Sequence, residues 1–167
     1  MPEQRHELPV DSDVEVDDIG PARPPRPVHL RWRYVGLVAL GGALGTGARE
    51  ALSMLIPGLG AFPLAIFLIN VSGAFALGLL LELLLRTGPD EGRRRRLRLL
   101  IGTGFMGGYT TYSTLAVGVA QSLVDGQAAI GVLYGILSVI VGAAAGFAGI
   151  VLAAGVHRRR TAAGGAR

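Results

Sequence analysis

Residues 102–114, which read GTGFMGGYTTYST, place glycines and hydroxyls inside an apolar stretch long enough to cross a bilayer. Gly102, Gly104, Gly107 and Gly108 disfavour a continuous helix, and a run of hydroxyl side chains follows them. In hydrocarbon every backbone N–H and C=O group needs a hydrogen-bond partner, so an interrupted helix survives only where it is buried in protein or lines a wet cavity. The stretch therefore predicts a broken membrane helix beside an ion or solute path.

The rest of the composition also favours a membrane protein. Half of the 167 residues are hydrophobic, and the mean hydropathy is +0.48. Four apolar runs, at residues 34–56, 62–85, 97–123 and 128–156, each reach the ~20 residues needed to cross the hydrocarbon core. We therefore expect an all-α membrane protein with four transmembrane helices, the third of them broken. The chain has no cysteine, which excludes a disulfide framework and a thiolate metal site.

Residues 1–31 differ from the rest of the chain. Seven acidic residues and no apolar run occur in the first twenty positions, which excludes a secretory signal peptide there. Residues 21–27 read PARPPRP, a composition that favours an extended chain. We interpret 1–31 as a disordered acidic and proline-rich tail, 32–157 as the membrane domain and 158–167 as a basic C-terminal tail. A proline-rich docking site for a partner is an alternative reading of the N-terminal tail.

The basic residues are distributed on one side of the predicted helices. All sixteen are arginine, and fourteen lie in the segments 23–33, 86–98 and 158–167. The other two loops, at 57–61 and 124–127, contain none. The positive-inside rule then places both termini and the middle loop in the cytoplasm of a cell-membrane protein. The arginine run in the middle loop is better explained by topology and contact with lipid headgroups than by nucleic-acid binding.

Few polar groups are expected inside the apolar runs, and each needs an explanation because a buried charge or amide is costly there. Glu82 and Arg86 are spaced for an interfacial ion pair, and Glu50 lies close enough to the outer surface to be solvated. Arg49 either extends outward to the surface or lines a vestibule, and the vestibule is favoured. Asn70 lies in the middle of the second run, so it either joins helices or lines a path.

Three segments together resemble the signature blocks of the Fluc/CrcB fluoride channels. These are GGALGTGAR at 41–49, NVSGAFALG at 70–78 and GFMGGYTTYST at 104–114, in the family's order and within residues 34–156. The resemblance implies a channel subunit that exports fluoride from the cytoplasm down its electrochemical gradient. It further implies an antiparallel dimer with two pores at its interface and a structural Na⁺ at the break of the third helix.

The resemblance also assigns roles to individual residues. The carbonyls of Gly107 and Thr110 would hold the sodium ion, and Arg49 would attract anions. Fluoride is small and strongly hydrated, so a selective path must replace water with hydrogen-bond donors. Some of the hydroxyls are expected only to bond back to their own helix. The complete set of path residues implied by the resemblance is Arg49, Asn70, Thr111, Tyr112, Ser113, Thr114, Leu115, Tyr134 and Ser138.

The chain departs from the family's pattern in ways that share one explanation. Tyr112 and Leu115 stand where the family has two phenylalanines whose ring edges face the ion. Tyr134 and Ser138 keep part of a hydroxyl stripe in the fourth run, but Gly142 and Gly146 interrupt it. The one-sided arginines also fix a single orientation, which cannot build an antiparallel homodimer. We therefore expect a heterodimer with an oppositely inserted homologous subunit.

Two other classes of membrane protein are alternatives. A four-helix, small-multidrug-type, proton-coupled exporter needs a membrane-embedded carboxylate, for which only Glu50 is available. A non-transporting membrane anchor explains the N-terminal tail but leaves Asn70 and residues 102–114 without a purpose. Enzyme chemistry is not expected, because the three histidines lie outside the apolar runs and share no metal-ligand spacing.

Overall fold

The computed structural model describes residues 31–164, with side chains described as far as residue 158, and its regular elements are helices. The tail predicted over residues 1–31 lies outside these residues except for its last position. The chain forms two compact units, Met1–Gly36 and Leu37–Arg167. Of the first unit, the structure describes the residues that begin helix α1, where the N–H groups of Tyr34 and Val35 donate to the carbonyl of Arg31.

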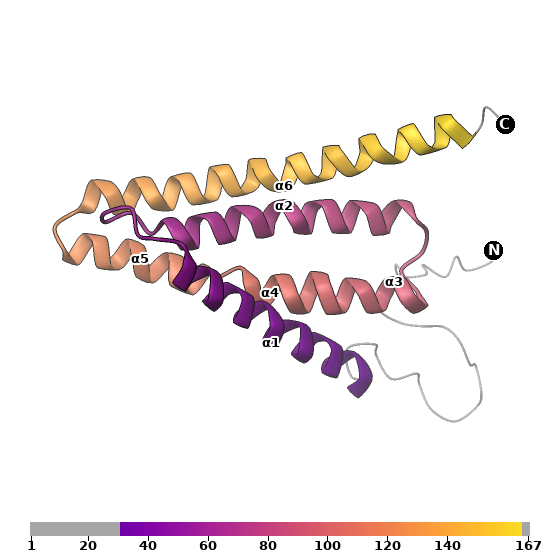
Figure 1. Cartoon of the computed structure of the whole chain (residues 1–167), viewed down its shortest axis with the longest axis horizontal. Helices are drawn as coiled ribbons and strands as arrows, with labels where there is room; N and C mark the ends of the chain where they lie inside the picture. The colour runs from indigo at the N-terminus through magenta and orange to yellow at the C-terminus, as the bar shows by residue number, and fades with distance from the viewer. Residues whose placement is uncertain (1–30, 165–167) are drawn as a thin grey trace, which may run out of the picture. The chain divides into compact units, whose positions relative to one another are not determined.

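Three long helices coincide with three of the predicted apolar runs. They are α1 (Trp32–Leu55), α2 (Leu64–Arg86) and α6 (Ala128–Gly164). Within the described part of the chain, two helices are long and apolar enough to cross a membrane, namely α2 and residues Ala128–Arg158 of α6. These two run side by side (Figure 1). The all-helical fold is confirmed, whereas the full set of four transmembrane helices stays a prediction.

The third predicted helix is interrupted. It is built from α3 (Gly92–Leu97), the π-helix η2 (Arg98–Phe105), α4 (Met106–Tyr109) and, after a gap, α5 (Tyr112–Val124). Thr110 and Thr111 fill the gap with extended backbone, at φ/ψ of −80°/154° and −149°/122°. The break therefore falls inside the glycine- and hydroxyl-rich stretch that predicted it, and it leaves α4 and α5 with separate ends (Figure 1).

Glycines bring the backbones of neighbouring helices into contact. A Cβ atom on Gly45 of α1 would collide with the carbonyl of Phe105, and one on Gly108 of α4 would collide with the carbonyl of Gly42. Similarly, Gly78 of α2 lies against the carbonyl of Gly146 of α6. Small residues allow this close approach, which is how helices associate when lipid offers no hydrophobic driving force. The packing holds the broken segment against α1 and holds α2 against α6.

Candidate ion-conduction site

Asn70, on α2, is bonded to the break by two hydrogen bonds. The Thr111 N–H donates to Asn70 Oδ1 at 2.8 Å, and Asn70 Nδ2 donates to the Thr111 carbonyl at 3.0 Å. We call this pair of bonds the Asn70 clamp. The clamp gives hydrogen-bond partners to both the N–H and the carbonyl of Thr111, which lies outside the helices. Such partners are needed because an apolar environment offers these backbone groups few others. Of the two predicted roles for Asn70, the structure thus shows the one that joins helices.

The Thr111 side chain begins the helix that follows the break. Thr111 is buried, and its Oγ1 accepts a hydrogen bond from the Thr114 N–H at 3.2 Å. The same oxygen donates to Thr114 Oγ1 at 3.0 Å and lies 3.1 Å from Ser113 Oγ. Thr111 is therefore the N-cap of α5, where a hydroxyl is among the preferred groups. The exposed Ser113 and Thr114 hydroxyls form one network with it.

The break also releases carbonyl groups from the helical pattern, among them those of Gly107 and Thr110. In a continuous helix the N–H groups of Thr111 and Thr114 would donate to the carbonyls of Gly107 and Thr110, four residues earlier. Both N–H groups are instead taken by side chains, those of Asn70 and Thr111. These two carbonyls belong to the residues for which the sequence predicted a cation. Carbonyl oxygens suit a hard monovalent cation, so the residues present fit such an ion.

A groove beside the break collects most of the predicted path residues. It has a volume of about 340 Å³ and is bordered by α2, the break, α5 and α6. Five of the predicted residues line it: Asn70, Thr111, Tyr112, Leu115 and Ser138. Tyr112 is 81% exposed, so none of the residues that the structure describes covers that wall of the groove. The groove thus combines a few polar groups with a lining that is mostly apolar.

The comparisons with known proteins identify the family of this chain. A protein-family model described as "CrcB-like protein, Camphor Resistance (CrcB)" matches residues 36–150. This chain belongs to the CrcB family. It is 50% identical over 134 residues to the fluoride-specific ion channel FluC 2 of Leifsonia xyli subsp. xyli, a match that covers 80% of this chain and 92% of the relative.

Two further relatives are also named fluoride-specific ion channels. The chain is 48% identical over 110 residues to the fluoride-specific ion channel FluC 1 of Cutibacterium acnes, covering 65% of this chain and 77% of the relative. It is 42% identical over 120 residues to the fluoride-specific ion channel FluC of Deinococcus radiodurans, covering 70% and 92%. The predicted family is thereby confirmed.

Four predicted path residues of this CrcB chain are not part of the groove lining: Arg49, Ser113, Thr114 and Tyr134. Arg49, near the end of α1, is partly exposed and forms no ion pair with any acidic residue that the structure describes. Tyr134 is fully buried against the ring of Phe62, at 5.3 Å between centroids and 84° between planes. Its hydroxyl has no partner among the described residues. Their roles in a path stay predictions.

One predicted donor of α6, the Ser138 hydroxyl, already forms a hydrogen bond within its own helix. Ser138 Oγ donates to the Tyr134 carbonyl at 2.7 Å, the back-bonding expected for some of these residues. Packing does not explain the two glycines that interrupt the stripe. A Cβ on Gly142 would meet open space, and one on Gly146 would lie 3.5 Å from the Ala74 carbonyl, an ordinary contact. A Cβ atom therefore has room at both positions, so packing does not require glycine there. The two glycines leave α6 with fewer polar side chains than it could carry.

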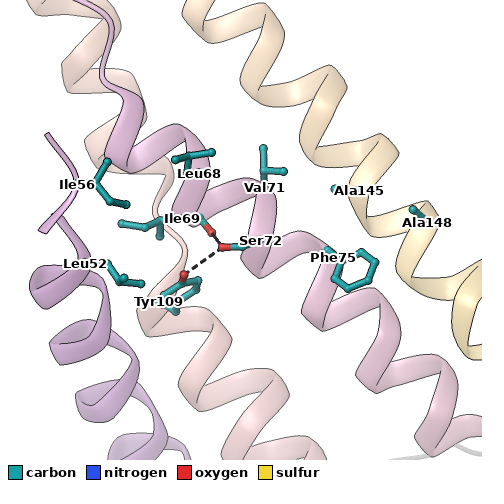
Figure 2. A pocket seen from close by; sticks show the side chains of 10 residues that line it. All are labelled: Leu52, Ile56, Leu68, Ile69, Val71, Ser72, Phe75, Tyr109, Ala145 and Ala148. Carbon is teal, nitrogen blue, oxygen red and sulfur yellow. Dashed lines mark hydrogen bonds between the residues drawn. The ribbon is translucent and has the colours of Figure 1, made fainter. Parts of the chain in front are cut away.

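A second cavity lies on a different side of α2 and is not suited to an ion. Figure 2 shows this cavity of about 620 Å³, whose lining is apolar apart from Ser72 and Tyr109. Their hydroxyls bond to each other at 3.0 Å, and Ser72 Oγ also donates to the Ile69 carbonyl at 3.1 Å. These polar atoms satisfy one another. The sequence analysis missed this pair, although Ser72 lies in the same block as Asn70.

Proposed function

We propose that this chain is one subunit of a fluoride channel that lets fluoride leave the cytoplasm down its electrochemical gradient. The observation that carries the proposal is the broken helix beside an open groove that contains Asn70 and Thr111, in a chain whose relatives are named fluoride-specific ion channels. Four transmembrane helices and an antiparallel dimer complete the proposed architecture. The proposed activity is the passage of an ion, so no enzyme activity is assigned.

The groove offers hydrogen-bond donors to a small anion even though the Asn70 clamp is closed. The Asn70 carboxamide carries two N–H donors, and the bond to the Thr111 carbonyl uses one of them. The exposed hydroxyls of Ser113 and Thr114 add further donors at the start of α5. Asn70 thus serves both predicted roles, since one N–H holds the break while the other is left for the path.

Anion flux measured from proteoliposomes tests the function. The chain is co-purified with its homologous partner subunit, and fluoride and chloride release are followed with ion-selective electrodes. Rapid fluoride release without chloride release or proton coupling is the expected result. Exchange of an organic cation for protons would instead identify the small-multidrug-type exporter. Failure to move either, in vesicles shown to contain both subunits, would favour the membrane anchor.

The orientation of the subunit is a separate proposal, based on the arginines around the start of α1, between the end of α2 and the start of η2, and at the end of α6. Both termini are placed in the cytoplasm. A reporter enzyme that is active only in the cytoplasm, fused after residue 167, should be active, and an exported reporter at the same place should be inactive. Comparable activity of both reporters would show dual insertion and would restore an antiparallel homodimer.

A structural sodium ion at the break is proposed on the released carbonyls of Gly107 and Thr110. The ion would neutralise partial negative charge that the break concentrates between subunits. A Cβ on Gly107 meets no atom within 4 Å inside the subunit, and the residue is exposed. Gly107→Val is therefore expected to leave the subunit folded but to reduce dimer formation and its dependence on Na⁺.

Size-exclusion chromatography with light scattering, in Na⁺ and in a large organic cation, measures this effect. Gly155→Val is the matched control, because a Cβ there also meets open space but lies far along α6 from the break. Normal, sodium-dependent assembly of Gly107→Val would contradict the placement of the ion at this carbonyl.

A further inference from the structure

The turn between α2 and α3 is held in shape by some of its own arginines. Arg94 donates from Nε to the Pro89 carbonyl at 2.7 Å and from a terminal nitrogen to the Thr87 carbonyl at 2.9 Å. A Cβ on Gly88 would lie 3.1 Å from the centre of the Arg94 guanidinium, and Gly88 has φ of +128°. Glycine therefore suits both the backbone and the space, and Arg94 is committed to the turn.

A second pair of arginines is committed to Asp90. Arg98 donates to Asp90 Oδ2 from Nε at 3.0 Å and lies 2.7 Å from it through a terminal nitrogen. Arg95 is 5% exposed, and its Nε lies 3.6 Å from the same carboxylate oxygen. One carboxylate thus serves two guanidinium groups. Nearby, Arg86 is paired with Glu82 at 2.5 Å.

Two arginines of the same segment are not committed in this way. Arg93 is exposed and forms no hydrogen bond or ion pair with any residue that the structure describes. Arg96 is exposed too, and its hydrogen bond to the Gly92 carbonyl is long, at 3.3 Å. Being three residues apart on α3, the two side chains lie on one face of the helix. We call Arg93 and Arg96 the outward arginine pair.

We propose that the outward arginine pair binds the phosphate of an anionic phospholipid headgroup, while Arg94, Arg95 and Arg98 build the turn that presents it. The choice of a lipid follows from position. The turn and α3 follow the end of the apolar helix α2 at Arg86 (Figure 1), so with α2 in a bilayer they would begin where the hydrocarbon ends. Guanidinium groups match phosphate oxygens in geometry and charge, and basic residues at a membrane surface attract anionic lipid.

Lipid contact measured at this turn tests the proposal. The chain lacks cysteine, so Glu91→Cys, whose native side chain forms no capping bond, allows one fluorophore to be attached beside α3. The labelled full-length protein is placed in bilayers containing spin-labelled phosphatidylglycerol or spin-labelled phosphatidylcholine, and quenching is compared. Stronger quenching by phosphatidylglycerol, weakened by salt, is expected.

Matched variants distinguish specific binding of lipid by the outward arginine pair from a general effect of positive charge. In this background Arg93→Gln and Arg96→Gln should each lower the preference for phosphatidylglycerol about fivefold. Arg86→Gln removes the same charge from the same segment, but from a residue already paired with Glu82, and should change the preference little.

Three results would overturn the proposal. One is equal quenching by the two lipids. Another is equal loss of preference in all three variants, which would show a diffuse charge effect. The third is full displacement of phosphatidylglycerol by inorganic phosphate at matched ionic strength, which would show a site for a soluble anion. Thermal unfolding of each variant, expected to be unchanged, confirms that the turn remains folded. The proposal does not depend on fluoride conduction.

Discussion

Asn70→Ala is expected to remove most fluoride flux from the paired channel and to destabilise the subunit. The substitution leaves the N–H and the carbonyl of Thr111 without their partners, and it removes the donor left for the path. Unpaired buried backbone groups cost about 1–3 kcal/mol each, so the two groups together predict a loss of about 2–6 kcal/mol of stability. A fall in flux of at least about tenfold is expected with it. Flux from proteoliposomes and thermal unfolding in detergent measure the two effects.

Two further variants show which function of Asn70 is lost. Asn70→Asp keeps an acceptor for the Thr111 N–H but loses both donors, so it should unfold at a higher temperature than Asn70→Ala and still conduct poorly. Ser72→Ala is the control from the same helix, because Ser72 bonds to Tyr109 and not to the break. It should conduct normally. Native stability and flux in Asn70→Ala would show that the Asn70 clamp is dispensable.

The sequence predicted the break because its physical cause is local. Glycines at 102, 104, 107 and 108 weaken the helix, and the hydroxyl that caps the next helix follows at Thr111. A side-chain amide in the middle of an apolar helix also needs a hydrogen-bond partner, and for this reason Asn70 was predicted to join helices or line a path. What the sequence left open was the partner itself. The Asn70 clamp joins residues 41 positions apart, and no periodicity within either segment reveals that distance.

Other features could not be read from the sequence for a similar reason. The π-helix η2 extends over eight residues before the break, and nothing in its composition separates it from an α-helix. Likewise, spacing alone did not show which small residues pack tightly. Gly45 and Gly108 lie against backbone, whereas Gly47, also on α1, meets open space. Only the contact between helices distinguishes a glycine needed for packing from one that faces outward.

The open groove bears on how the channel is completed. Tyr112 and Leu115 line it where the family pattern has phenylalanines, and Gly142 adds no side chain although one would fit. The side of the groove at Tyr112 is uncovered in this chain. In the proposed dimer a second subunit closes the path and supplies ring edges or hydroxyls that this chain lacks. On the orientation proposed from the arginines of this chain, that subunit would be inserted the other way.

The chain expressed alone is therefore expected to give little fluoride flux, and co-expression with an oppositely oriented homologue is expected to restore it. The defect in the chain alone has two independent causes, since uniform insertion prevents antiparallel pairing and a homodimer would lack the phenylalanine edges in both of its pores. Reversing the orientation of half of the molecules would not by itself repair the pore. The fluoride flux of the pair is expected to exceed that of the chain alone at least about a hundredfold. An ion that loses its water must be stabilised by several hydrogen-bond donors at once, and the chain alone lacks more than one of them.

Proteoliposomes holding about one dimer per vesicle, prepared from the chain alone or from the co-purified pair, measure the difference directly. A control for assembly is chemical crosslinking of both preparations, which should trap a dimer of unlike subunits only in the pair. The double variant Tyr112→Phe and Leu115→Phe, made in the chain alone, separates the two causes. If uniform insertion alone prevents formation of the channel, this variant conducts no fluoride. Fluoride flux through the variant would show that the missing phenylalanines cause the low flux of the chain alone. Rapid fluoride release by the unmodified chain alone would show that it needs no second kind of subunit, and that Tyr112 and Leu115 are themselves sufficient for the path.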